Sequence, residues 1–130
     1  MEKKGLKFSY TFKKKDMNMA IKVYRGNSTW SEVILTCEHP KVFRGNSTWG
    51  DVLMTIDGNK IHEGNSTWST VLATIDGNKV YRGNSTWGEV IATIDGSKVY
   101  RGNSTWSEVI ATTEGGRMSG AAAAVYLLLL

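Results

Sequence analysis

Cysteine and proline each occur once in this 130-residue sequence, and histidine occurs twice. The single Cys37 excludes an internal disulfide and a CxxC metal site, which fits a reducing compartment. His39 and His62 have no Cys or His cluster near them in the sequence, so no zinc site is predicted. Nucleotide-binding, zinc-protease and calcium-loop motifs are also absent. We therefore expect a protein that is not an enzyme and that holds no metal or cofactor.

Long apolar segments are missing too. No secretory signal is visible, because no apolar stretch follows the lysine-rich N-terminus. The apolar segment AAAAVYLLLL, residues 121–130, is shorter than the roughly 20 residues that a helix needs to span a bilayer. We therefore expect no transmembrane segment and a cytoplasmic location.

Acidic side chains are scarce only near the N-terminus. Residues 1–25 carry eight basic and two acidic side chains, a net charge of +6, and the remaining residues carry −2. One interpretation is a basic patch that attaches the protein to nucleic acid or an anionic surface. The interpretation we favour is a solvated terminal strand or arm, because charged segments are usually solvated.

What the sequence does contain is a repeat. The pentapeptide GNSTW occurs at residues 26–30, 45–49, 64–68, 83–87 and 102–106, always nineteen residues apart. A catalytic site needs one copy of its groups, whereas a repeating architecture needs one copy per unit. The repeat therefore indicates a structural role for its tryptophans and asparagines. These are Trp30, Trp49, Trp68, Trp87, Trp106, Asn27, Asn46, Asn65, Asn84 and Asn103.

Each unit also contains a predicted β-hairpin. The segments VIATID and KVY are rich in β-branched and aromatic residues and lack helical spacing. Between two such segments stand Gly58, Gly77 and Gly96, each followed by Asn or Ser. A type II′ turn requires positive φ at its first central residue, which glycine supplies. This turn predicts the pairs Thr93–Tyr100, Ile94–Val99 and Asp95–Lys98.

The pentapeptide predicts a second reversal of the chain. Its glycine supplies an unusual backbone conformation, and Asn, Ser and Thr hydrogen-bond neighbouring amides in turns. We expect Trp to be buried or stacked between units, since burial is the usual state of so large an apolar side chain. An exposed aromatic binding stripe is the alternative. The threonine columns 29/48/67/86/105 and 36/55/74/93/112 are explained equally by cross-strand bonding or by flat hydroxyl arrays that bind ice or glycans.

The first unit departs from the pattern in its hairpin turn and at one core position. Glu38-His39-Pro40-Lys41 replaces Asp-Gly-Asn-Lys, and proline does not suit the second central position of a type II′ turn. This loop should therefore have another shape. Cys37 stands where other units have isoleucine, so we expect a core residue and not a nucleophile.

The C-terminal segment is predicted to be a short helix over residues 120–130, with Ser119 as its cap. It is apolar on every side, so it should be buried rather than lie on the surface. It could serve as a plug inside a ring of hairpins, as a lid, or at an interface for self-association or a protein partner. Attachment of this segment to a membrane is the remaining alternative.

The segment ATIDGNKVYRG, residues 73–83, resembles the short hairpin repeats of uncharacterised bacterial proteins that include the β-flower proteins. In those proteins, I-D-G-x-x-[IV]-Y units form hairpins around a pseudo-symmetry axis. The resemblance covers residues 20–114. It implies a bacterial source and no catalytic residues.

We therefore predict an all-β array of five 19-residue hairpin repeats in a single domain, residues 1–130. It comprises a basic N-terminal strand or cap (1–25), the repeats (26–118) and an apolar cap or plug (119–130). A parallel β-solenoid is the alternative fold. For function we expect a non-enzymatic structural or interaction module. A glycan- or cell-wall-binding module, and attachment to nucleic acid or an anionic surface through the N-terminus, are the alternatives.

Overall fold

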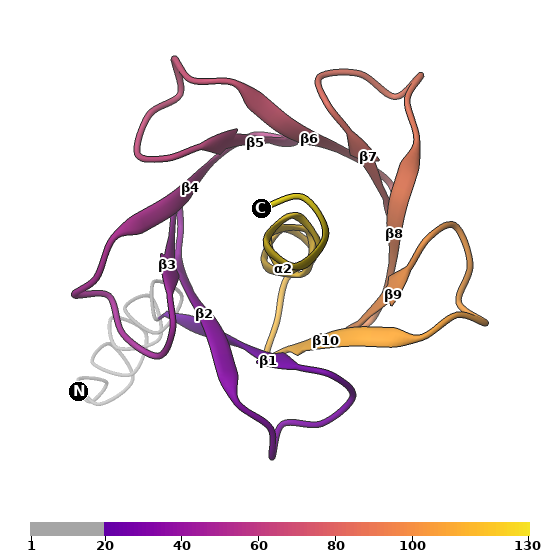
Figure 1. Ribbon diagram of the computed structural model, residues 1–130, viewed down its shortest axis with the longest axis horizontal. Helices are drawn as coiled ribbons and strands as arrows, with labels where there is room; N and C mark the ends of the chain where they lie inside the picture. Colours follow the sequence, from indigo (N-terminus) through magenta and orange to yellow (C-terminus); the bar gives the residue numbers. More distant parts are fainter. Residues whose placement is uncertain (1–19) are drawn as a thin grey trace, which may run out of the picture.

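The structure is a computed structural model and describes residues 20–130. Within this range, ten antiparallel strands close into a barrel around one helix (Figure 1). The elements are β1 (Ile21–Arg25), β2 (Val33–Glu38), β3 (Lys41–Arg44), β4 (Val52–Asp57), β5 (Lys60–Glu63), β6 (Val71–Asp76), β7 (Lys79–Arg82), β8 (Val90–Asp95), β9 (Lys98–Arg101), β10 (Val109–Thr113) and α2 (Arg117–Leu128). The strand expected at residues 6–12 lies outside the described residues.

The two reversals in each unit give the barrel two distinct ends. GNSTW loops connect β1 to β2, β3 to β4 and so on, at what we call the loop end. Hairpin turns connect β2 to β3, β4 to β5 and so on, at the turn end. Pairing of β1 with β10 closes the ring, with Val23 opposite Thr113. The predicted all-β array of hairpins is confirmed, and the structure shows that it is a closed ring.

The solenoid alternative is wrong. Val71 and Val90 are not paired with each other, because they pair with His62 and Tyr81 on antiparallel neighbours. A solenoid coil would bring equivalent strands side by side in parallel. Two reversals in nineteen residues instead return every strand antiparallel to the one before it.

The hairpin turns have the predicted register. Thr93 lies opposite Tyr100, Ile94 opposite Val99 and Asp95 opposite Lys98. The turn glycines Gly58, Gly77 and Gly96 have φ of 61°, 64° and 63°. No non-glycine residue in the described range has positive φ, so the second central residue has the negative φ of a type II′ turn. The first unit differs as expected, with a cis peptide bond between His39 and Pro40.

A β-bulge follows each GNSTW loop. On β4, Val52 and Met54 oppose consecutive residues of β3, which leaves Leu53 as the extra residue. The bulge lets two successive side chains contact the core, because the extra residue breaks the alternation of faces. The bulged residues add an apolar ring at the loop end of the lumen. They are Ile34, Leu53, Leu72, Ile91 and Ile110.

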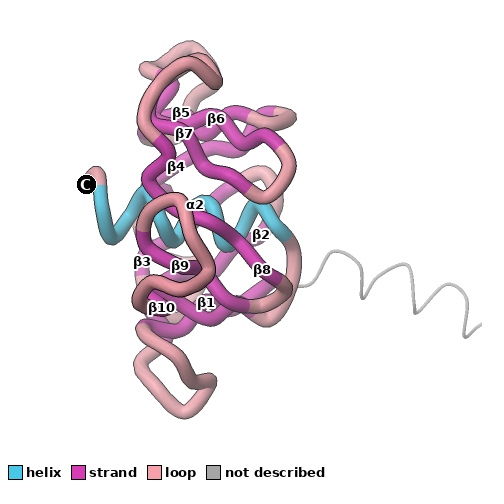
Figure 2. Tube along the Cα trace, turned by 90° about the vertical axis from the view of Figure 1, so that its right-hand side faces the viewer, coloured by secondary structure: helices cyan, strands magenta, loops and turns pink. Residues whose placement is uncertain are grey.

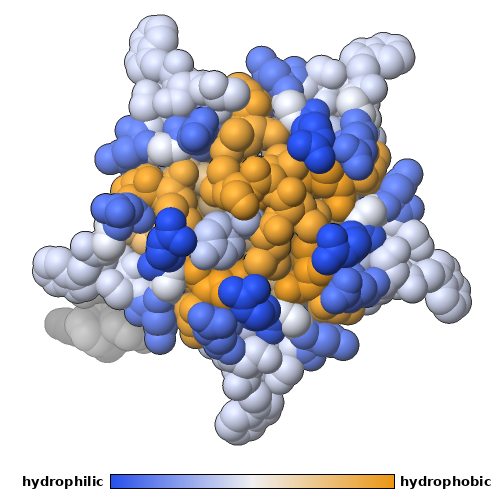
Figure 3. All heavy atoms as spheres, viewed as in Figure 1, coloured by the Kyte–Doolittle hydropathy of each residue, from blue (hydrophilic) through white to orange (hydrophobic). Residues whose placement is uncertain are grey.

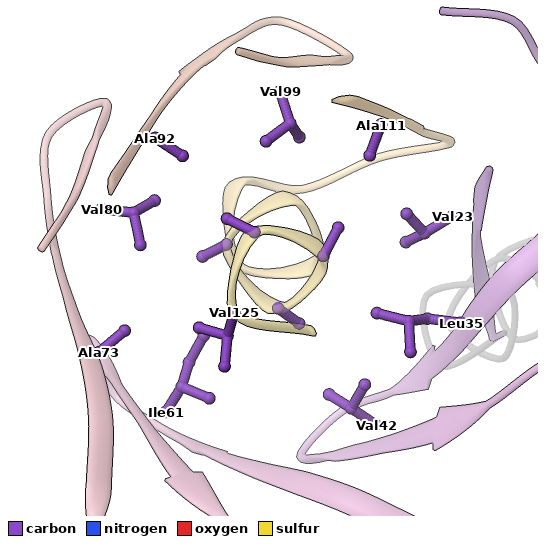
Figure 4. Close-up of a cluster of buried hydrophobic side chains, with 14 of the residues drawn as sticks. Val23, Leu35, Val42, Ile61, Ala73, Val80, Ala92, Val99, Ala111 and Val125 are labelled. Carbon is purple, nitrogen blue, oxygen red and sulfur yellow. The ribbon is translucent and has the colours of Figure 1, made fainter. Parts of the chain in front are cut away.

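The lumen is lined by apolar side chains that are completely buried (Figure 4). One ring consists of Val23, Val42, Ile61, Val80 and Val99, and the other of Leu35, Met54, Ala73, Ala92 and Ala111. Helix α2 runs along the barrel axis from the turn end to the loop end (Figures 1 and 2). Its segment 120–125 is fully buried. A helix that is apolar on every side suits a lumen that surrounds it, so the plug interpretation is confirmed.

Side-chain size sets the position of the helix within the lumen. Leu35 and Met54 are large, whereas later units have alanine at the same position. Helix α2 contacts β8, β9 and β10 more extensively than β2. A Cβ atom on Gly120 would lie 3.2 Å from Val99 Cγ2. The small side chains of the last units therefore make room for a closely packed helix.

The expected helix cap is wrong. Helix α2 begins at Arg117 after Gly116, with no side-chain cap. Ser119 instead lies inside the first turn and is buried; its hydroxyl donates to the Gly116 carbonyl (2.9 Å) and is 2.6 Å from Thr113 Oγ1. A buried hydroxyl needs such partners, and the strand and first helical turn supply them.

Candidate binding surfaces

The GNSTW loops project from the barrel like the points of a star (Figures 1 and 3). Their tryptophan side chains are 94–97% exposed. The favoured prediction of buried or stacked tryptophans is therefore wrong. The loops diverge from a narrow barrel, so neighbouring loops offer the indole rings no surface to pack against.

Hydrogen bonds donated by backbone N–H groups hold the loops in one shape. In each copy the Trp N–H donates to the hydroxyl of the Ser two residues earlier, at 2.9 Å. This is the turn chemistry predicted for the serine. At the base of the first loop, Arg25 N donates to Glu32 O at 2.9 Å, and the same bond recurs from Arg82 to Glu89 and from Arg101 to Glu108. The tryptophans are thus exposed on ordered loops.

The asparagines of the repeat lie in the same loops and are all exposed. The backbone carbonyl of Asn27 accepts a hydrogen bond from Lys98 Nζ at 3.4 Å. Their side chains are accessible to a ligand and belong to the same loops as the indole rings. The hairpin-turn glycines Gly58, Gly77 and Gly96 lie at the other end of the barrel, so the repeat residues form two separate groups.

The threonine column at residues 36, 55, 74, 93 and 112 anchors the loops to the barrel. These threonines are buried, and each hydroxyl donates to the carbonyl of a loop glycine at 2.7–2.8 Å. Thr112, for example, bonds Gly26 across the β1–β10 closure. Because these hydroxyls are buried and bonded, the flat ice- or glycan-binding array is wrong for this column.

Cys37 and His62 are both structural. Burial raises the pKa of the Cys37 thiol to about 12, so it is a thiol rather than a nucleophilic thiolate at neutral pH. His62 is buried, with Nδ1 3.0 Å from Ser69 O and Nε2 3.8 Å from Asp57. Residues 20–130 contain no group of three or more His, Cys, Asp or Glu side chains suited to a metal ion.

A second surface lies at the loop end, where α2 emerges from the barrel. Leu127, Leu128 and Leu129 are partly buried there, and Leu130 is 55% exposed. Tyr126 is half-buried, and Arg44 donates to its hydroxyl at 3.2 Å. Two equivalent grooves of about 330 and 300 Å³ flank the leucines.

Arg–Glu pairs, which were not predicted from the sequence, border these grooves. They are Arg25–Glu32, Arg82–Glu89 and Arg101–Glu108, with N–O distances of 3.1–3.3 Å. The available signal was a seven-residue spacing across the GNSTW loop, which puts both residues at its base. In the part of the chain that is described, no helix is long and apolar enough to cross a membrane.

Comparison with known proteins assigns the fold to a family. Neither the curated proteins nor the solved structures include a match. A family described as "6-fold beta flower protein" matches residues 23–128. The described part of this chain closes with five GNSTW loops instead of six units. Since the match spans the strands and the central helix, the chain belongs to the β-flower family.

Proposed function

We propose that this protein is a non-enzymatic binding module whose GNSTW loops together bind a repetitive glycan, with cell-wall polysaccharide as the ligand class. The observation that carries the proposal is the exposure of all five tryptophans, at 94–97% of each side chain. Tryptophan is enriched at interaction surfaces, because its side chain combines a large apolar area with an N–H donor. Nothing in the packing of the barrel requires them.

The chemistry of the loop tips suits sugar rings. An indole presents a broad apolar face, which stacks on the C–H face of a pyranose. Its N–H, and the exposed asparagine amide and threonine hydroxyl nearby, can hydrogen-bond sugar hydroxyls. Each tip is small, so we expect a single tip to bind a sugar only weakly.

Repetition supports a polymer as the ligand. Five equivalent tips on one rigid barrel can engage successive segments of a chain, or neighbouring chains of a wall. The second and later contacts are then intramolecular, which raises avidity without new chemistry. A monomeric sugar would gain nothing from the repeat.

Charge argues against a polyanion as the ligand of the barrel. Residues 20–130 carry ten basic and ten acidic side chains. A nucleic-acid surface needs a net positive field. The basic residues 3–15 lie outside the described residues.

The test is a binding assay on insoluble cellulose, chitin and peptidoglycan, with bound protein measured by depletion. We expect the wild type to bind at least one of them. Trp68→Ala should weaken binding, and a second substitution, Trp87→Ala, should lower avidity by a further factor of about ten or more. Trp68→Phe retains an aromatic face and serves as the matched control. The melting temperature checks that every variant is folded.

Two results would contradict the proposal. One is a variant with all five tryptophans changed to alanine that binds as well as the wild type. The other is a wild type that binds none of the polysaccharides.

A further inference from the structure

We propose that the loop end of the barrel is a self-association surface, on which a second copy of this chain docks face to face. This loop-end face consists of Leu127–Leu130, the bulged residues Leu53 and Leu72, and the charged residues around them. The proposal concerns a different surface from the tryptophan tips and does not rest on glycan binding.

The centre of this face is apolar and continuous. Figure 3 shows the hydrophobic residues gathered in the middle of the star, over the end of α2. Leu127–Leu129 and the bulged Leu53 and Leu72 are only partly buried, in contrast to the completely buried rings inside the lumen. A contiguous apolar patch of this kind is a feature of interaction surfaces.

The rim of the face carries both signs of charge. At the base of four of the five loops a basic residue ends one strand and an acidic residue precedes the next, whereas the third loop has Glu63 and the uncharged Thr70. The basic residues are Arg25, Arg44, Arg82 and Arg101, and the acidic ones are Glu32, Asp51, Glu63, Glu89 and Glu108. The paired side chains remain more than half exposed, so they can reach a partner.

This charge pattern favours a second copy of the chain as the partner that binds the loop-end face. Four basic and five acidic groups give no net attraction to an anionic membrane or a nucleic acid. A rim on which basic and acidic residues alternate at four of the five loops, around an apolar centre, is instead complementary to itself. A two-fold axis parallel to the face turns one copy over onto the other, and each arginine can then meet a glutamate of the second copy.

The shape of the loop-end face, with a projecting helix end and grooves beside it, also suits a second copy. The end of α2 projects beyond the strands (Figure 2). Grooves of about 330 and 300 Å³ lie beside it, each with two arginines, one glutamate and an apolar floor that includes Leu127 or Leu128. The projecting leucines of one copy can enter the grooves of the other. Since the tryptophan tips point outward from the axis, they stay free in such a dimer.

The experiment measures the mass of the full chain by analytical ultracentrifugation over a range of concentrations. We expect a wild-type dimer. An acidic-rim variant, Arg25→Glu/Arg82→Glu/Arg101→Glu, and a basic-rim variant, Glu32→Arg/Glu89→Arg/Glu108→Arg, should each be monomeric because like charges then meet. Mixed in equal amounts, the two variants should form a heterodimer.

Controls separate this effect from a general effect of charge or unfolding. Reversal of three turn-end charges, Asp57→Lys/Asp76→Lys/Asp95→Lys, should leave the dimer intact, because these residues lie at the opposite end. Leu130→Lys should raise the dimer dissociation constant roughly tenfold or more without altering the rim. Exposed ion pairs contribute little to folding, and thermal unfolding checks that the variants are folded.

A wild type that stays monomeric at all concentrations overturns the proposal, and binding of that monomer to vesicles would identify a lipid occupant instead. The proposal also fails if the turn-end variant dissociates the dimer, or if Leu130→Lys leaves it unchanged. Failure of the two rim variants to form a heterodimer would exclude the face-to-face arrangement.

Discussion

Single residues decide where the chain reverses. Gly77 and Gly96 adopt φ of 64° and 63° at the hairpin turns, and no atom lies within 4 Å of a Cβ built on either one. Their requirement for glycine is therefore one of backbone conformation and not of space. This requirement is local, and it is why the turns could be predicted from the sequence.

Replacing Gly77 or Gly96 with valine should lower the free energy of unfolding by roughly 1–3 kcal/mol, because a β-branched residue is strained at positive φ. Chemical denaturation measures the change. Gly50→Ser is the matched control, since Gly50 has an ordinary φ and open space around it, and other units have serine at this position. Equal effects at Gly50 and Gly77 would show that backbone strain is not the cause.

Cys37 makes stability depend on pH. Burial raises the pKa of its thiol from 9.0 to about 12. Above about pH 9 the unfolded chain therefore loses a proton that the folded chain retains, which favours unfolding. The free energy of unfolding should fall by about 1.4 kcal/mol per pH unit until the folded thiol ionises as well.

Comparison with Cys37→Ile isolates this effect, because other units have isoleucine at the same position. Lysine and tyrosine groups that also titrate in alkali are common to both proteins. Denaturant unfolding at pH 8, 9.5 and 11 should show a stability difference between the two proteins that changes with pH. A constant difference would mean that the pKa of the thiol is the same in the folded and the unfolded chain.

The tryptophans could not be placed from their residue type. A large apolar side chain is usually buried, but these rings lie in loops where the barrel offers them no cover. The deciding factor is the radial divergence of the loops, which depends on ring closure. For the same reason, the seven-residue spacing could pair the charged residues of one loop but could not show that the five loop bases form one rim.

At the scale of elements, the hairpins were predictable and their closure was not. Strand pairs follow from the glycine turns and the alternation of residues within nineteen positions. Closure depends on pairing β1 with β10, which are separated by most of the chain. The helix was recognised because it is apolar on every side, yet its start at Arg117 was missed because glycine precedes it in place of a capping side chain.

Helix α2 should be indispensable for folding. A chain that ends at Gly120 would lose the fully buried residues 121–125 and leave an apolar lumen open to water. We expect it to lose cooperative thermal unfolding or to aggregate, as measured by circular dichroism and light scattering. A truncated chain that stays monomeric and equally stable would contradict the role of the helix as a plug.

A point substitution tests the fit of the same helix. Ala122 is completely buried, so Ala122→Leu should overpack the lumen and cost about 1–3 kcal/mol of unfolding free energy. Leu130→Ala, at an exposed position of the same segment, should change the stability of the monomer by less than about 0.5 kcal/mol. If both changes have the same effect, the lumen is not tightly packed.

At the scale of the whole molecule, the number of units and the width of the helix are matched. A ring with more strands has a wider lumen, and a helix whose buried segment 121–125 consists of four alanines and one valine fills only a narrow one. The family description names a six-fold arrangement, whereas the described part of this chain makes ten strands. The nineteen-residue pattern does not encode the number of units, because a unit would have the same local turns in a five-unit ring as in a six-unit ring.

Duplicating residues 77–95 directly after Asp95 should therefore destabilise the fold. The added unit preserves every turn but widens the lumen, and the unfilled volume should cost at least about 3 kcal/mol. Denaturant unfolding measures this cost. Replacing residues 77–95 with a copy of residues 58–76 keeps the unit number and is the control. A duplicated chain as stable as the control would show that the helix does not limit the ring.

The position of α2 after the repeats also affects how the protein is made. A ribosome releases the N-terminal part of a chain first, so all the strands emerge before the segment that fills their lumen. Until residues 121–125 leave the exit tunnel, the apolar inner faces of the strands have nothing to enclose. The nascent hairpins are exposed to aggregation during that interval, and a pause in translation near Gly120 would prolong it.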